Sequence, residues 1–324
     1  MSQMTSLRAR APRPQLIHTL ALAGLLTACT FGPGGSPSPT PGPTGSPNQT
    51  ATPSPTPSPS PTPSPTLNPD QIEHPTGATD IVLRMENGGG FVPFEWIVTQ
   101  APQFTLYGDG TVVFRPIEDT IGRVGGSNGL PRFLTGKMTE EGIQALLLYA
   151  LDTGGLATAK ANYDNPMVAD ASTTIFNINA GGEEKVVSIY ALFEMPDPQV
   201  PDGADRARFA QLQELLTNFE READSTLDQV AVYDPEAYRV VLFEGMGEPV
   251  GEPIEWPWDD IDVEDFPTGD EPGGTLVLDR EHVARLVEVP SGGELSIWAE
   301  APDGTLVSFA VRPLLPDEIA AAEL

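Results

Sequence analysis

Cysteine and lysine are scarce in this chain of 324 residues. Cys29 is the only cysteine, so the chain forms no intramolecular disulfide and holds no metal ion between several thiolates. Lys137, Lys160 and Lys185 are the only lysines, and 17 basic residues face 46 acidic ones, a formal net charge of −29. Because phosphate contacts need clustered lysine and arginine, we expect no binding to nucleic acid.

Acidic residues are absent from the first 69 positions. Three arginines precede position 14, residues 16–26 are mostly apolar, and small residues follow. This order is typical of a secretory signal peptide, and the apolar run is too short to cross a bilayer stably. The sequence therefore predicts that residues 1–28 are a signal peptide and that the rest of the chain lies outside the cytoplasm.

The end of this segment, Leu26, Thr27, Ala28 and Cys29, resembles the lipobox of bacterial lipoproteins. The resemblance implies cleavage before Cys29 and attachment of a diacylglycerol to its thiol. Two acyl chains suffice for stable membrane attachment. We therefore expect a lipid-anchored protein on the extracytoplasmic face of the cell membrane. The alternative is an ordinary signal peptide in which Cys29 has no role.

Proline dominates the next segment, residues 29–75. Residues 31–69 carry no charge and hold 14 of the 35 prolines, and Pro53–Thr66 alternates proline with serine or threonine. Such a tract favours polyproline II and buries no core, which predicts a disordered stalk. At about 3.1 Å per residue, forty residues span at most roughly 120 Å. A docking site for a proline-binding module is the alternative interpretation.

The remaining sequence predicts an α+β fold, with antiparallel sheets built of hairpins and a few amphipathic helices packed on one face. In the first unit, residues 76–225, we expect strands at 81–85 and 94–98 and hairpins at 104–114 and 174–190. Helices are expected from Thr139 to Gly154 and after Asp202, each beginning at an N-cap residue. The second unit, residues 226–324, is predicted to be smaller and richer in strands.

The second unit has its own expected elements. Strands are predicted at 238–243 and 276–278, a helix at 280–287 capped by Asp279, and a hairpin at 295–311. The hairpin turns over Asp303-Gly304, as the hairpin of the first unit turns over Asp109-Gly110. Shared turn chemistry explains this likeness more simply than an internal repeat does.

The run Tyr107-Gly108-Asp109-Gly110-Thr111, with this order of elements, resembles domains of unknown function in secreted bacterial proteins. The likeness implies a fold of the same class and brings no activity with it.

Two sequence patterns bear on catalysis. Residues 125–129 match the motif GxSxG, in which Ser127 would be a nucleophile and His282 its base. The motif requires a buried strand before it and a helix after it, whereas Arg123-Val124 and Leu130-Pro131 flank it here. We therefore interpret 125–129 as a surface loop. No paired-histidine spacing for zinc occurs in the sequence.

The segment 255–266 is the most suggestive for binding. Asp260, Asp262 and Glu264 alternate as in part of an EF-hand loop, which makes Ca²⁺ the one candidate cofactor. Asp265 stands where the EF-hand turn needs glycine, so a solvated acidic loop is the simpler interpretation. Trp256 and Trp258 would stack on a sugar or protein ligand if they are exposed; otherwise they cover the core of the second unit.

Together these patterns favour a non-enzymatic lipoprotein that displays an acidic binding domain on a stalk. Its expected partners are the membrane, through the anchor, and a protein or glycan at the cell surface. The alternatives are an extracellular hydrolase acting on envelope glycan or peptide, and a purely structural envelope protein.

Overall fold

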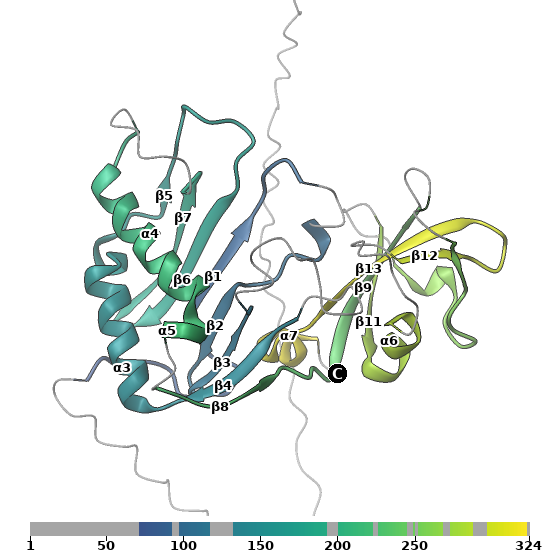
Figure 1. Ribbon diagram of the computed structural model, residues 1–324, viewed down its shortest axis with the longest axis horizontal. Coiled ribbons are helices and arrows are strands. Elements are labelled where there is room, and N and C mark those ends of the chain that lie inside the picture. The colour runs from purple at the N-terminus through teal and green to yellow at the C-terminus, as the bar shows by residue number, and fades with distance from the viewer. Residues whose placement is uncertain are drawn as a thin grey trace, which may run out of the picture. The chain divides into compact units, whose positions relative to one another are not determined.

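The computed structural model describes residues 71–92, 97–116, 132–192, 200–222, 226–244, 249, 252–267, 273–287 and 297–322. Residues 64–324 form one compact unit. Within it the fold is α+β, with two mostly antiparallel sheets and short helices, as the sequence predicts (Figure 1).

The first sheet has eight strands in the order β5-β7-β6-β1-β2-β3-β4-β8. Its neighbours pair antiparallel except β5, which is parallel to β7. The strands are β1 (Ile81–Gly88), β2 (Phe104–Tyr107), β3 (Thr111–Phe114), β4 (Leu134–Met138), β5 (Asn162–Tyr163), β6 (Thr173–Ala180), β7 (Glu183–Tyr190) and β8 (Leu227–Val232). The expected hairpins β2–β3 and β6–β7 are both present.

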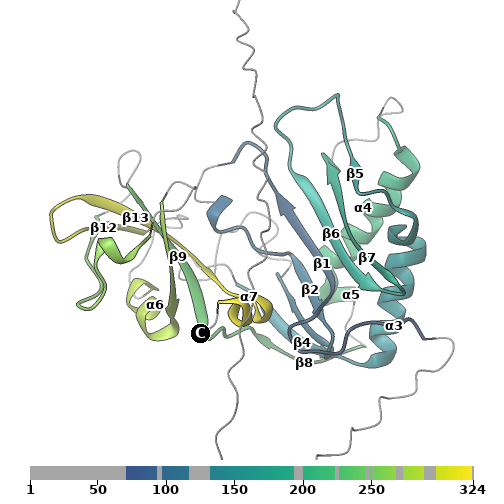
Figure 2. The same cartoon turned by 180° about the vertical axis from the view of Figure 1, so that it is seen from behind.

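Helices cover one face of this sheet. These are α3 (Glu140–Leu148), which continues as a π-helical turn (Tyr149–Thr153), α4 (Gly203–Thr217) and α5 (Phe219–Glu222). Leu147 of α3 and Phe209 of α4 are buried in one core with alternate residues of the strands, such as Phe176. Figure 2 shows the sheet from the opposite side, where β1, β6 and β7 lie in front of these helices.

The predicted N-cap residues of α3 and α4 differ in whether their side chains cap the helix. Thr139 is the N-cap of α3, and its hydroxyl accepts from Gly142 N at 3.2 Å, as predicted. Asp202 precedes α4, but it has φ 60° and its side chain makes no capping bond. Its carboxylate instead accepts from Lys160 Nζ at 2.5 Å. Asp202 thus stands at the N-cap position of α4 as predicted, but its side chain does not cap the helix and binds a more distant lysine instead.

One expected strand is wrong. Ile97 and Val98, the end of the predicted strand 94–98, lie in a helical turn, and Gln100 N donates to Ile97 O at 3.3 Å. Residues 93–96 lie outside the described part. Aromatic and β-branched residues favour strands only where a neighbouring strand can pair with them.

The second sheet has five strands in the order β10-β12-β13-β9-β11. Its elements are β9 (Ala237–Glu244), β10 (Ile254–Glu255), a 3-10 turn (Val263–Asp265), β11 (Gly274–Asp279), α6 (Arg280–Val287), β12 (Ile297–Glu300), β13 (Leu306–Pro313) and α7 (Pro316–Ala321). The helix at 280–287 is confirmed, and Asp279 Oδ1 accepts from His282 N at 3.0 Å at its start.

Strand β8 lies in the first sheet although it follows residue 225, where the sequence was divided. At the other end of the folded part, Leu315 packs against Tyr107, Val113 and Phe133 on the face of the first sheet opposite the helices. The two sheets are thus linked both through the chain and through this contact.

Candidate functional site

The loop that follows β1 exposes a large apolar side chain. Gly89 and Gly90 have φ angles of 69° and 90°, which residues with a side chain rarely adopt. They turn the chain so that Phe91, with 92% of its surface exposed, projects from the end of the first sheet. A single exposed apolar residue is common on protein surfaces, so Phe91 indicates a contact surface only together with further exposed apolar side chains on a neighbouring loop.

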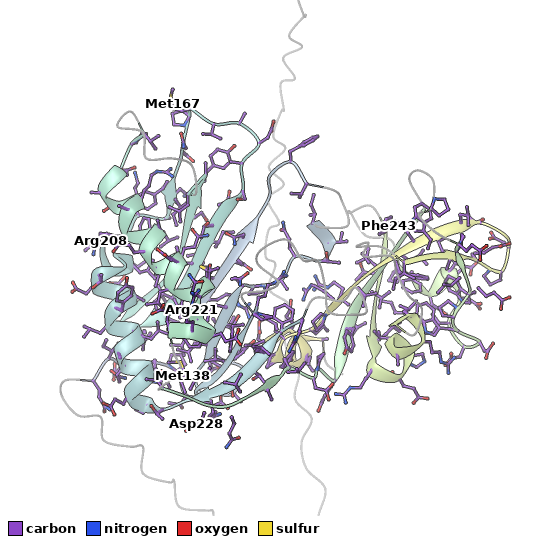
Figure 3. All side chains as sticks on the ribbon, in the orientation of Figure 1. Met138, Met167, Arg208, Arg221, Asp228 and Phe243 are labelled. Atoms are coloured by element: carbon purple, nitrogen blue, oxygen red, sulfur yellow. The ribbon has the colours of Figure 1, made fainter. Side chains whose placement is uncertain are left out.

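A second loop, residues 164–172, lies beside the first. Phe91 N donates to Asp170 O at 3.1 Å, and Asp170 itself has φ 60°. Met167 on this loop is 58% exposed and lies at the end of the sheet opposite Met138 (Figure 3). Within the loop, buried Asn165 accepts from Met167 N at 3.1 Å through its side chain. We call Phe91 and Met167, with the exposed carboxylates Asp164 and Asp170, the loop tip.

A buried arginine holds the base of the second loop. Arg206 of α4 is 8% exposed, and its guanidinium donates only to backbone carbonyls among the bonds described. Nη2 donates to Tyr163 O at 3.0 Å and to Asp164 O at 2.8 Å, and Nη1 donates to Tyr190 O at 2.9 Å. Nε donates to Pro201 O at 3.3 Å. Burial lowers the pKa of Arg206, and the charges of Asp202 and Asp164 offset this only in part.

Tyr163, at the base of the second loop, makes further contacts with α4. Tyr163 is buried against Phe209 at a ring-centroid distance of 4.9 Å, and its hydroxyl donates to Asp205 Oδ2 at 3.3 Å. Burial raises the pKa of Tyr163, so it stays a neutral donor at neutral pH. Lys160 Nζ lies 4.7 Å from the same ring. The second loop therefore leaves a strand that is fixed to α4 by hydrogen bonds and packing, which limits the entropy lost when the loop tip meets a partner.

The two tryptophans proposed as ligand-binding residues lie in the second core. Trp258 is 3% exposed, and its Nε1 donates to His282 O at 3.0 Å. Trp256 is half-buried, and its Nε1 donates to Ile261 O at 2.8 Å. Both rings contact Phe309, at centroid distances of 5.5 and 5.2 Å. Trp256 and Trp258, two positions apart, do point the same way. They point inward, because the apolar side chains of the sheet, such as Phe309, lie beneath them.

The acidic residues proposed to bind Ca²⁺ do not point toward a common centre, and two of them have other roles. Asp262 is the N-cap of the 3-10 turn, in which Glu264 lies. Asp260 Oδ2 lies 3.2 Å from His282 Nε2 instead. Among the residues described, no group of three or more histidine, cysteine or acidic side chains is placed to hold a metal ion.

His282, which a serine hydrolase with Ser127 would have needed, lies between two carboxylates. Nδ1 lies 2.8 Å from Asp279 Oδ1, and Nε2 faces Asp260. The hydrogen bond to Asp279, followed by that to Asp260, raises the pKa of His282. In return, the bond to His282 lowers the pKa of Asp260. The arrangement ties the 254–266 segment to the start of α6.

Several predicted residues lie outside the described part of the chain. They are Ser127 and its loop, and the whole lipobox, namely Leu26, Thr27, Ala28 and Cys29. Of the helices described, none is both long and apolar enough to span a bilayer.

Sequence reasoning missed the loop tip. The run Gly88-Gly89-Gly90 indicated only the end of a strand, although Phe91 directly after it was the available signal. Met167 had no signal, because the bonds that hold the base of its loop come from Arg206 on α4, which is distant in sequence.

Comparison of the chain with protein-family models, with curated proteins and with solved structures finds no match. The function is therefore argued from the residues themselves.

Proposed function

We propose that the protein is a membrane-anchored extracytoplasmic lipoprotein whose folded part is a binding domain for a protein partner. The observation that carries the binding role is the exposure of Phe91 on a loop joined by a hydrogen bond to the anchored Met167 loop. Aromatic and methionine side chains are enriched where proteins contact one another. The lipobox-like Leu26–Cys29 supports the anchor.

The charge of the loop tip indicates the chemistry of the partner. The exposed carboxylates Asp164 and Asp170 share the loop of Met167, and Asp170 is bonded to Phe91. A partner that suits this surface has an apolar pocket with a basic rim. An anionic lipid surface suits it poorly, because like charges repel.

The test of binding uses the full chain with a photo-cross-linking residue at position 169, an exposed position beside Asp170 on the Met167 loop. We expect cross-linking to one envelope protein, weakened at least tenfold by the double substitution Phe91→Ser and Met167→Ser and reduced by added salt. Leu306→Ser is the matched control, because Leu306 is an exposed apolar residue on the hairpin of the second sheet. Equal capture by the double variant and the wild type would contradict the proposal, as would recovery of glycan alone.

The anchor is tested separately. Cys29→Ser removes the thiol that would be acylated, so the variant should move from the membrane fraction to the soluble fraction or keep its signal peptide. Fractionation followed by mass spectrometry of the N-terminus measures both outcomes. A Cys29→Ser protein that stays in the membrane fraction with residues 1–28 removed would show that another element holds it there.

A further inference from the structure

The C-terminal segment, residues 314–321, is joined to both sheets. On the side of the second sheet, Leu314 N donates to Ala237 O at 3.0 Å. On the side of the first sheet, Leu314 O accepts from Tyr233 Oη at 2.9 Å, and Tyr233 N in turn donates to Phe133 O. Leu315 is buried in the apolar cluster that the first sheet supplies, made of Tyr107, Val113 and Phe133.

The Asp317 carboxylate of α7 lies between two donors of the first sheet. Arg84 Nη2 donates to Asp317 Oδ1 at 2.7 Å, and Tyr107 Oη donates to the same oxygen at 2.5 Å. The side chains of Arg84 and Asp317 are only 13% and 19% exposed. Burial by itself lowers the pKa of Arg84, but the bond to Asp317 and its charge outweigh this and raise it. Burial, then the bond to Asp317, raises the pKa of Tyr107.

The next residue, Glu318, is bound on the side of the second sheet. Arg312 of β13 donates to its two carboxylate oxygens, from Nη1 at 2.8 Å and from Nη2 at 2.6 Å. Leu315 N also donates to Glu318, at 2.9 Å, so Glu318 caps its own helix. Burial opposes the ionisation of Glu318, but the bonds and charge of Arg312 outweigh it and hold its pKa below the ordinary value. Two consecutive carboxylates thus bind arginines of different sheets.

A helix of this size has no stability of its own. The helix α7 has six residues, and isolated helices shorter than about 12 residues are marginal in water. Its position therefore depends on Leu315, Asp317 and Glu318. Short segments held by a few contacts open at a lower free energy than the sheets on which they pack.

We propose that residues 314–321 are a reversible latch: they occupy a binding site for an acidic peptide on the first sheet and, while bound, hold the two sheets together. The site consists of an apolar floor, Tyr107, Val113 and Phe133, and of Arg84 as the carboxylate receptor. Its ligand has an apolar residue two positions before an aspartate, as in Leu315-Pro316-Asp317. When the latch opens, this site becomes accessible while both sheets stay folded. The proposal is independent of the anchor and of the loop tip.

The first test compares hydrogen exchange in the full chain. Asp317→Asn removes the charge that Arg84 and Tyr107 bind, and Asp259→Asn makes the same change at an exposed position. Hydrogen bonds to a charged group stabilise more than those to a neutral one, so loss of the charge should make the segment open more often. We expect about 10- to 100-fold faster exchange in peptides covering 314–322. Peptides from β1, β6, β9 and β13 should keep their rates in both variants. Uniformly faster exchange in both sheets, or unchanged exchange at 314–322, would overturn the latch.

The second test supplies the ligand in trans. A fluorescent synthetic peptide of residues 313–322 is added to the full-length Asp317→Asn chain, and binding is followed by anisotropy. The same peptide with Asn at position 317 should bind at least tenfold more weakly. Equal binding of the two peptides, or binding of neither, would show that the site does not recognise the carboxylate.

Should Asp317→Asn fail to fold, Tyr107→Phe replaces it in the exchange test. This variant removes one donor and keeps the ring in the apolar cluster. It should speed exchange at 314–322 by about 3- to 10-fold. Wild-type exchange in Tyr107→Phe would equally contradict the proposal.

Discussion

Replacement of Arg206 by methionine tests how the scaffold of the loop tip is held. Methionine keeps much of the buried volume but removes all the donors of the guanidinium. Four carbonyl oxygens then lose their partner, those of Tyr163, Asp164, Tyr190 and Pro201. They belong to the end of β5, the end of β7 and the segment before α4, so one side chain joins three segments distant in sequence.

The expected loss of stability follows from burial. A buried carbonyl left without a donor costs about 1–3 kcal/mol, and the substitution also removes a buried cation whose desolvation opposed folding. For four carbonyls, some of which water can reach after the change, we expect a net loss of about 3–5 kcal/mol. At about 2–4 °C per kcal/mol, the melting temperature should fall by about 6–20 °C.

The assay is urea and thermal unfolding of the full chain, and the same helix offers a matched control. Arg208 (Figure 3) also donates to backbone carbonyls, of Thr153 and Asp152, but it is only half-buried, whereas Arg206 is 8% exposed. Arg208→Met should therefore cost less than about 1 kcal/mol. Arg206→Lys should fall between the two, because an ammonium cannot span four carbonyls. Equal losses for Arg206→Met and Arg208→Met would refute the argument that burial sets the magnitude.

Two further predictions concern pH and turn geometry. Because Asp279 and Asp260 raise the pKa of His282, its stabilisation should be complete below its ordinary pKa of about 6.5 and lost as the pH rises through its higher folded-state pKa. Urea unfolding from pH 5 to 9 should show this loss in the wild type and not in His282→Gln; parallel profiles would contradict it. Gly110→Ala should destabilise by about 1–2 kcal/mol more than Gly304→Ala. Both have φ near 85°, but a Cβ at Gly110 would lie 2.8 Å from Met138 O, whereas the nearest atom at Gly304 is 4.0 Å away. Equal thermal shifts would argue that the φ angle alone decides the cost.

Prediction from sequence succeeded where the deciding contacts are local. Asp109 Oδ1 accepts from Thr111 N at 2.9 Å and Asp303 Oδ1 accepts from Thr305 N at 2.8 Å, so each Asp-Gly-Thr turn is built from its own residues. The same holds for Thr139 at the start of α3 and for Asp279 at the start of α6. The α+β class followed, since hairpins make antiparallel sheets and amphipathic helices need an apolar face to cover.

The loop tip was only partly predictable in this way. Phe91 directly after the glycine run is a local signal, but its bond to Asp170 and the bond from Arg206 to Asp164 join segments distant in sequence. Two expectations outside the loop tip also turned on distant partners. The Asp202 carboxylate binds Lys160 and does not cap α4, and the two tryptophans, which the sequence left free to face a ligand or the core, point inward because Phe309 lies below them.

Having one cysteine, the chain can form no intramolecular disulfide and no metal site of several thiolates, and this needs no structure. The scarcity of lysine predicts that it does not bind nucleic acid, and the pattern around Cys29 predicts where it is anchored. Local hydrogen bonds at turns and helix starts likewise belong to the sequence alone. Only the tertiary structure decided that Phe91 is exposed, that Arg206 is buried, and that Asp317 reaches Arg84 across 233 positions. The reason is that burial and charge pairing depend on which surfaces pack together in the fold, and the local sequence around a residue does not determine that.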